Sequence, residues 1–174
     1  MNNTLAVLKL VSKFCAKHDC RPMMQNIMVK PVYSEGNVTL YATAGYTAIR
    51  ATIGIDNYIA PLWEQITCES IEKAVKVDDL DLLRQPDFEI NFPSFDKVFN
   101  RRDFVSTLTA GFNTKLMLGI FQALEGFRKD LKVKLGRIEF QELSADSSNF
   151  MTWIINEGLQ SQIKIEIAVM PLRG

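Results

Sequence analysis

The sequence predicts an α+β domain built from two similar halves. A helical apolar pattern followed by three short strand patterns occurs twice, near residues 1–54 and again near residues 104–174. The chain has 174 residues, of which 47% are apolar, enough for a substantial core. Residues 55–103 show no clear period and are expected to be an irregular connecting insertion. We therefore expect one domain over 1–174.

The first half opens with a predicted helix. Asn2 or Asn3 can cap this helix, and Asp19 and Pro22 are expected to end it. Its apolar stripe is formed by Leu5, Leu8, Val11 and Cys15. Three short runs with turn residues between them follow and predict strands at 27–32, 38–43 and 47–53. This half is thus expected to be a helix followed by an antiparallel meander.

The middle of the chain has weaker patterns. Residues 67–76 fit a strand or a helix, and the predictions after them are a short acidic helix at 77–83, a strand at 88–92 and a helical turn at 93–99.

The second half repeats the order of the first. A strand is predicted at 104–110, and a helix is predicted from Asn113 or Thr114 to about Glu125, with Gly126 as its C-cap. Three strand patterns close the chain, at 132–140, 150–156 and 162–170.

Charge and hydropathy exclude several classes of protein. Lys and Arg equal Asp and Glu at 20 each, with six against two in residues 1–50, four against ten in 51–100 and ten against eight in 101–174. The zero total argues against a protein that grips DNA by bulk charge, because such affinity needs many neutralised phosphates. A weakly basic inner surface is still compatible with it. The sequence has no apolar run of membrane-spanning length and no signal-peptide pattern, so we expect a cytoplasmic protein without membrane contact.

The reactive side chains form no recognisable catalytic or metal site. Cys15, Cys20 and Cys68 cannot all pair with one another, and the close group of Cys15, His18 and Cys20 lacks a fourth ligand. No nucleophile motif accompanies His18, no glycine-rich phosphate loop occurs, and the acidic run at 78–81 lacks a strand context. We expect no enzyme activity, no metal and no cofactor.

Three segments of the chain carry a family resemblance. Strand 163–169 runs into Met170-Pro171-Leu172-Arg173, the segment 21–29 is followed by Tyr-Ala-Thr-Ala-Gly-Tyr-Thr-Ala-Ile-Arg-Ala at 41–51, and the connector 91–99 precedes Ala-Gly-Phe-Asn at 110–113. In this order the segments resemble the bacterial sliding clamps, the family of the DNA polymerase III beta subunit, over about half of the chain. The resemblance implies a DNA-clamp-like domain, with two helices packed on one face of antiparallel sheets formed by two β-α-β-β-β-type halves.

The resemblance also implies a function. It suggests a DNA polymerase processivity factor, in a minimal form of the kind that a phage or mobile element carries. Such a protein encircles double-stranded DNA as a homo-oligomer, binds it weakly and without sequence specificity, and tethers a DNA polymerase or other clamp-binding proteins. The alternative is an interaction module that keeps the clamp fold, binds a protein partner and does not encircle DNA.

Basic residues near the first helix and at the start of the second are the candidate DNA contacts that this resemblance implies. They are Lys9, Lys13, Lys17, Arg21 and Lys115. Lys9, Lys13 and Lys17 recur every fourth residue, away from the apolar stripe. Without the resemblance, such a stripe is more typical of a solvated helix face than of a binding surface.

Two other segments occupy positions similar to those that build an apolar pocket for short linear peptides in the family. These residues are Gly45, Tyr46, Thr47, Met170, Pro171 and Leu172. A methionine suits such a pocket because its unbranched side chain adapts to varied apolar anchors. Ala44 stands where the family usually has an aspartate, and Tyr46-Thr47 replaces a histidine-arginine pair. The alternative is that these strand-end residues only pack a core.

Overall fold

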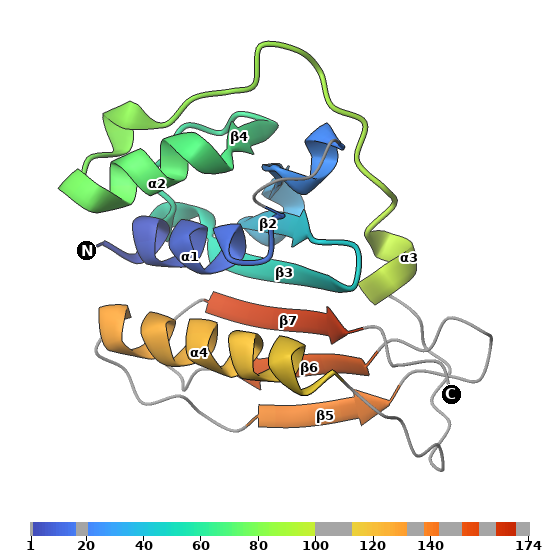
Figure 1. Ribbon diagram of the computed structural model, residues 1–174. Helices are drawn as coiled ribbons and strands as arrows, with labels where there is room; N and C mark the ends of the chain where they lie inside the picture. Colours follow the sequence, from blue (N-terminus) through green and yellow to red (C-terminus); the bar gives the residue numbers. More distant parts are fainter. Residues whose placement is uncertain are drawn as a thin grey trace.

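The computed structural model describes residues 2–16, 21–99, 113–131, 138–142, 151–156 and 163–169, and their elements form two layers (Figure 1). One layer is a seven-stranded sheet with the order β4-β1-β2-β3-β7-β6-β5, in which every pairing is antiparallel. The strands are β1 (Asn26–Val32), β2 (Asn37–Thr43), β3 (Thr47–Gly54), β4 (Gln65–Thr67), β5 (Ile138–Glu142), β6 (Met151–Asn156) and β7 (Ile163–Val169). The helices are α1 (Asn3–Ser12), α2 (Cys68–Val77), α3 (Asp96–Phe99) and α4 (Thr114–Leu131).

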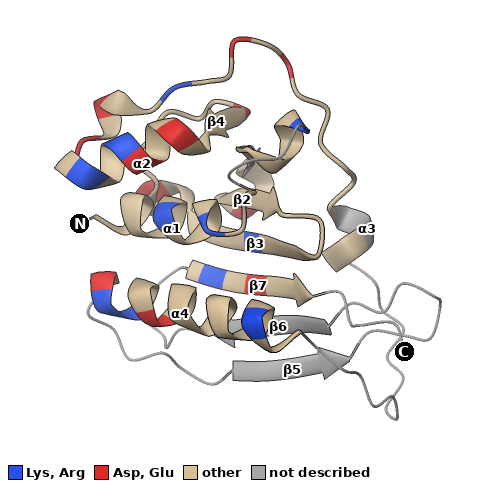
Figure 2. Cartoon of the chain, in the orientation of Figure 1, with Lys and Arg blue, Asp and Glu red and all other residues tan. Residues whose placement is uncertain are grey.

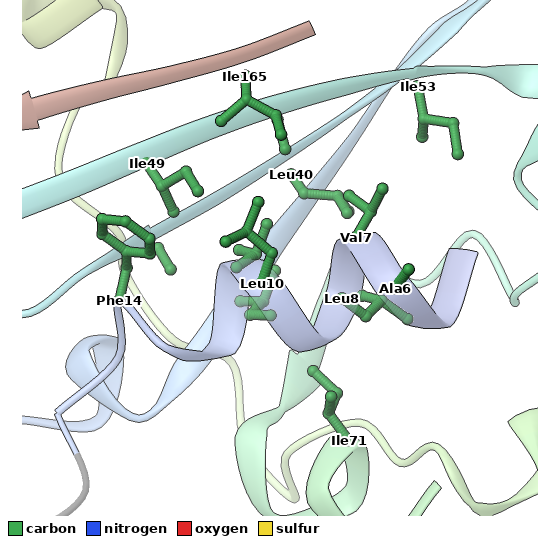
Figure 3. Close-up of a cluster of buried hydrophobic side chains, with 14 of the residues drawn as sticks. Ala6, Val7, Leu8, Leu10, Phe14, Leu40, Ile49, Ile53, Ile71 and Ile165 are labelled. Atoms are coloured by element: carbon green, nitrogen blue, oxygen red, sulfur yellow. The ribbon is translucent and has the colours of Figure 1, made fainter. Parts of the chain in front are cut away.

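Helix α1 lies at the centre of the helical layer, between α2 and α4 (Figure 1). Its first turn is capped as predicted, since Asn2 Oδ1 accepts a hydrogen bond from the Leu5 amide at 2.8 Å. In Figure 3, Val7 and Leu10 point toward the sheet, while Ile71 of α2 lies on the other side of the helix. All residues from Thr4 to Val11 except Lys9 are buried, so α1 is a core helix with little solvent-facing surface.

The C-terminal end of α1 differs from the prediction. The helix ends at Ser12 rather than near Asp19, and the amides of Lys13 and Phe14 bond to carbonyls three residues back. This tighter turn directs Phe14 into the core, where it is buried. The Ala16 amide then bonds to the Met24 carbonyl at 2.7 Å, which ties the chain to the approach to β1 and prevents a longer helix.

The predicted meander of the first half is confirmed by β1, β2 and β3. Its register pairs Val29 with Leu40 and Leu40 with Ala51, so these three residues lie side by side across the strands. Alternate apolar residues face the helices and join one core with α1, α2 and α4.

The second half has the same construction, which confirms the predicted clamp-like arrangement of two helices on one face of an antiparallel sheet. Helix α4 packs Ile120, Leu124 and Phe127 into the same core as α1. The two helices lie side by side and run in opposite directions (Figure 1). Strands β5, β6 and β7 form the second meander; the strand predicted at 104–110 and residues 132–137 lie outside the described residues.

Part of the middle segment, 55–103, forms regular elements that join the sheet and the helical layer. Strand β4 pairs with β1, and the ambiguous residues 67–76 form helix α2, whose start is capped by Thr67 Oγ1 through the Ser70 amide. The predicted acidic helix shortens to a single 3-10 turn at Leu80–Leu82. The helical turn predicted at 93–99 is confirmed as α3.

The strand predicted at 88–92 is wrong. The backbone of Ile90 bonds to the side chain of Gln65, which accepts from the Ile90 amide at 3.2 Å and donates to its carbonyl at 2.9 Å. A side-chain amide thus satisfies both backbone groups that a neighbouring strand would otherwise bind.

The two halves join where β3 pairs with β7. Across this seam Arg50 lies directly opposite Glu166, and the guanidinium donates two hydrogen bonds to the carboxylate, of which Nη2 to Oε1 measures 2.7 Å. Burial disfavours the charged form of Arg50, but the hydrogen bond and charge of Glu166 outweigh it and raise the pKa of the guanidinium. The Arg50 guanidinium carbon also lies 4.9 Å from the centre of the Phe99 ring.

In the described residues, no helix is both long and apolar enough to span a bilayer.

The Gly126→Ala substitution tests the end of α4. The sequence predicts Gly126 as a C-cap, but the helix continues through it to Leu131, and a Cβ built there would contact nothing within 4 Å. We expect the substitution to raise the free energy of unfolding by about 0.5–1 kcal/mol, because alanine loses less backbone entropy in a helix. Urea unfolding measures it. Gly36→Ala is the matched control and should be destabilising, because Gly36 has φ +63°.

The Glu166→Gln substitution tests the seam. Side-chain exposure is 5% for Glu166 and 14% for Arg50, so loss of the carboxylate leaves a largely buried cation without its counter-charge. We expect a loss of about 2 kcal/mol in the free energy of unfolding, measured by denaturant titration. Lys164→Gln removes the other cation near Glu166, at 3.3 Å, but that lysine is half exposed. Its effect should stay below about 0.5 kcal/mol, and an equal effect of both variants would contradict the proposed role of the seam pair.

Candidate functional site

The β2–β3 turn holds the first of the two predicted peptide-binding segments. The Thr43 hydroxyl donates to the Thr47 carbonyl at 2.9 Å and accepts from the Gly45 amide at 3.1 Å. The Ala44 amide also bonds to the Thr47 carbonyl, at 3.0 Å. Gly45 has φ +88°, a conformation that glycine adopts without strain. The turn is therefore fixed from within, while the Tyr46 side chain remains 70% exposed.

The strand register places this turn beside the end of β7. Thr47, the first residue of β3, pairs with Val169, the last residue of β7. These two residues are more than a hundred positions apart in the sequence. Met170, Pro171 and Leu172, the second predicted segment, lie outside the described residues. Their role in peptide binding stays a prediction.

Two further side chains border the turn. A Cβ placed on Gly45 would lie 3.5 Å from Met24 Cε and 3.8 Å from Arg21 Nη2. The sequence suggested Arg21 as a DNA contact together with the first helix, but the structure places it beside the turn. Met24 was not predicted as a site residue; its place in the segment Pro22-Met23-Met24 was the only signal in the sequence.

An aromatic cluster lies on the face of the sheet away from α1, α2 and α4, near the same end. Tyr41 stacks on Phe95 with ring centroids 5.0 Å apart, and Phe99 is 6.3 Å from Tyr41. Ala48 and Ala168 complete this buried cluster. Helix α3 therefore covers the sheet behind the turn (Figure 1), which fixes the strand ends from which the turn projects. The pattern at 93–99 predicted a helical turn but not this covering role.

The predicted basic stripe on the first helix is not continuous. Lys9 Nζ lies 2.7 Å from Asp130 Oδ2 at the end of α4, so it connects the two helices. Lys13 is exposed at the C-cap, beyond the last residue of α1, and Lys17 lies outside the described residues. Because the helix ends at Ser12, the four-residue repeat does not produce one helical face. Lys115 is exposed in the first turn of α4.

The charges of the helical layer are mixed (Figure 2). On α4, Glu125 accepts hydrogen bonds from Arg128 at 2.7 and 2.8 Å, and these bonds lower the carboxyl pKa to about 2. On α2, Glu69 pairs with Lys73 at 2.6 Å. Several basic side chains of the layer are therefore paired with neighbouring carboxylates.

No group of three or more His, Cys, Asp or Glu side chains is arranged to hold a metal ion in the part of the chain that the structure describes.

Comparisons with known proteins identify the fold. No protein-family model matches the sequence, and no curated protein matches it either. The structure is similar to the DNA polymerase sliding clamp from Pseudomonas aeruginosa, with a TM-score of 0.58, 12% sequence identity and coverage of 98% of this chain and 66% of that one. It is also similar to a DnaN sliding clamp (DNA polymerase III subunit beta) from the same species bound to griselimycin, with a TM-score of 0.59, 12% identity and coverage of 98% and 64%. The chain thus has a sliding-clamp-like fold and spans just under two thirds of these clamps' length.

Proposed function

We propose that this protein is a sliding-clamp-like tethering factor that binds a short apolar segment of a DNA polymerase or another clamp-binding protein. The observation that carries the proposal is the pairing of Thr47 with Val169, which sets the β2–β3 turn and its exposed Tyr46 beside the end of β7, the strand that precedes the second candidate segment in the sequence. The similarity to sliding clamps supports it at the level of the fold.

The chemistry around the β2–β3 turn suits a weak, apolar peptide contact. Tyr46 offers an exposed ring, and the buried Met24 packs its flexible thioether close to Gly45. The turn is held by its own hydrogen bonds and backed by the aromatic cluster, so little order has to be gained on binding. Arg21 can add one charged contact at the border of the site.

We further propose that an oligomer encircles double-stranded DNA with the helical layer inward. The exposed Lys13 and Lys115 are the described lysines best placed for phosphate contact, because Lys9 is paired with Asp130. A small number of unpaired lysines gives weak binding without sequence preference, which permits sliding. The two sheet edges differ: β4 has three residues, and β5, of five, pairs only with β6 among the described residues. Unlike edges can join head to tail into a ring.

The second candidate function is an interaction module that does not encircle DNA. The Lys9–Asp130 ion pair favours it, because a lysine predicted to face DNA instead stabilises the contact between α1 and α4. In this case the peptide site is kept, and copies associate through like edges into a dimer or remain monomeric.

The Tyr46→Ala substitution tests the peptide site. Short peptides with two or three apolar anchors, selected on the immobilised protein, and griselimycin serve as probes. We expect the substitution to weaken probe binding about tenfold in calorimetry, because it removes the largest exposed apolar group at the turn. Tyr33→Ala is the matched control: Tyr33 is equally exposed, at 72%, but follows β1 at the opposite end of β2, and its loss should not change binding. Equal losses in both variants, or failure to select any peptide, would contradict the site.

The mass in solution and retention on circular DNA distinguish the two candidate functions. Light scattering on this 19.7 kDa chain should give a hexamer if six one-domain subunits close a ring. The double variant Lys13→Glu and Lys115→Glu should then shorten retention on nicked circular DNA about tenfold, through lost phosphate contacts. Lys30→Glu, on the opposite face of the sheet, should have no effect. A monomer or dimer at every concentration, without DNA retention, would reject the ring and leave the interaction module.

A further inference from the structure

A pocket lies away from the candidate peptide site, where the segment after α1 meets the start of α2. Its volume is about 620 Å³, and Cys15, Asn26, Thr67 and Cys68 are part of its lining, with Asp87 and Phe88 from the connecting segment. Phe88 is 59% exposed, so the pocket is accessible to a small solute. Neither the clamp-like fold nor the proposed function accounts for the two thiols in its wall.

The backbone brings the two cysteines together. Strand β4 pairs with β1 so that Asn26 lies opposite Thr67, and the Cys68 amide bonds to the Gln25 carbonyl at 3.2 Å. The Cys15 thiol lies 3.7 Å from the Asn26 carbonyl oxygen, so both cysteines adjoin the same residues at the start of β1. Both cysteines are free, and both line this pocket. Because the strand register and the turn after α1 place them beside the same residues at the start of β1, their proximity is built into the fold.

We propose that Cys15 and Cys68 form an oxidative modification site, at which a hydroperoxide that enters the pocket converts the two thiols into a disulfide. Thiols that adjoin the same backbone segment can be joined with little backbone movement, and Cys15 and Cys68 both adjoin Gln25 and Asn26. Both cysteines are partly exposed, and the pocket that they line gives a small hydroperoxide access to them.

The chemistry proceeds in two balanced steps. The Cys68 sulfur attacks one oxygen of hydrogen peroxide and breaks the O–O bond, which gives a sulfenic acid and one water. The Cys15 sulfur then attacks the Cys68 sulfur, and the hydroxyl leaves with the thiol proton as a second water. Two electrons pass from the thiols to the peroxide. Cys68 is the attacking group because the Cys15 thiol donates its proton to the Asn26 carbonyl oxygen at 3.7 Å, which favours the protonated, less nucleophilic form of Cys15. The neighbouring Cys68 and burial also raise the pKa of the Cys15 thiol.

The cross-link would have a mechanical consequence. It would join the end of α1 to the first residue of α2 and close the chain between residues 15 and 68 into a covalent loop. A closed loop restricts the unfolded chain and so stabilises the folded one. The loop contains the β1–β2–β3 meander and its β2–β3 turn, so oxidation would stabilise the element that carries the candidate peptide site.

The Cys20→Ser variant of the full chain is the protein to test, since it keeps only the two cysteines of the pair. Hydrogen peroxide near stoichiometry should remove both free thiols. Peptide mapping without reductant should find the Cys15 and Cys68 peptides linked within one monomer, and the melting temperature should rise by about 5–10 °C. Dithiothreitol should reverse both changes. Two thiols that remain free, a link between different chains, or oxidation to sulfinic acid without a link would each overturn the proposal.

The single variants Cys15→Ala and Cys68→Ala, each in the Cys20→Ser background, provide the matched controls. Neither should gain thermal stability with peroxide, because each lacks one sulfur of the link. Cys15→Ala should accumulate the Cys68 sulfenic acid, which a dimedone probe captures, whereas Cys68→Ala should show little capture. Equal capture in both would overturn the assignment of Cys68 as the attacking thiol. Disulfide formation between Cys15 and Cys68 is tested in the Cys20→Ser variant alone, so that test stays decisive even where a single variant does not fold.

Discussion

The pairing of β3 with β7 is the constraint on which the rest of the structure depends. It joins residues that are more than a hundred positions apart, so forming it costs loop-closure entropy that local pairs such as β1–β2 avoid. The Arg50–Glu166 pair and the long run of apolar neighbours across the seam offset that cost. The seam also sets how the two halves of the chain contact each other. It aligns α1 with α4 on one face of the sheet and places the start of β3 beside the end of β7.

The seam explains why the sheet is covered on both faces at one end. On the helical face, Ile49 and Ile167 pack under α1 and α4, while on the other face Ala48 and Ala168 lie beneath the aromatic rings of α3. Small residues beneath large rings leave room for α3 to approach the strands closely. The Phe99 ring also shields the Arg50 guanidinium, which strengthens its bond to Glu166 by excluding water. One short helix thus supports both the seam and the β2–β3 turn.

The features that the sequence predicted best are those set by local periodicity. The meanders and the cap at Asn2 follow from patterns a few residues long, and the structure confirms them. Predictions failed where a distant partner decides the outcome. Ile90 fits a strand, but the Gln65 side chain occupies its backbone groups. Gly126 fits a C-cap, but the contacts of Phe127 with the core continue the helix through it.

The candidate site shows the same division. Both peptide-binding segments were predicted only through a family resemblance, and the pairing of Thr47 with Val169 depends on the register of β3 against β7, which no local pattern encodes. The lysine repeat was a local pattern, yet its interpretation changed because Asp130, from the other half of the chain, binds Lys9. Lys9 therefore contributes to the contact between the helices, and less of the basic charge remains for a ligand. If the helical layer binds DNA, the basic residues that attract the phosphates must lie near the helix ends, because the residues at the centre of α1 are buried in the core.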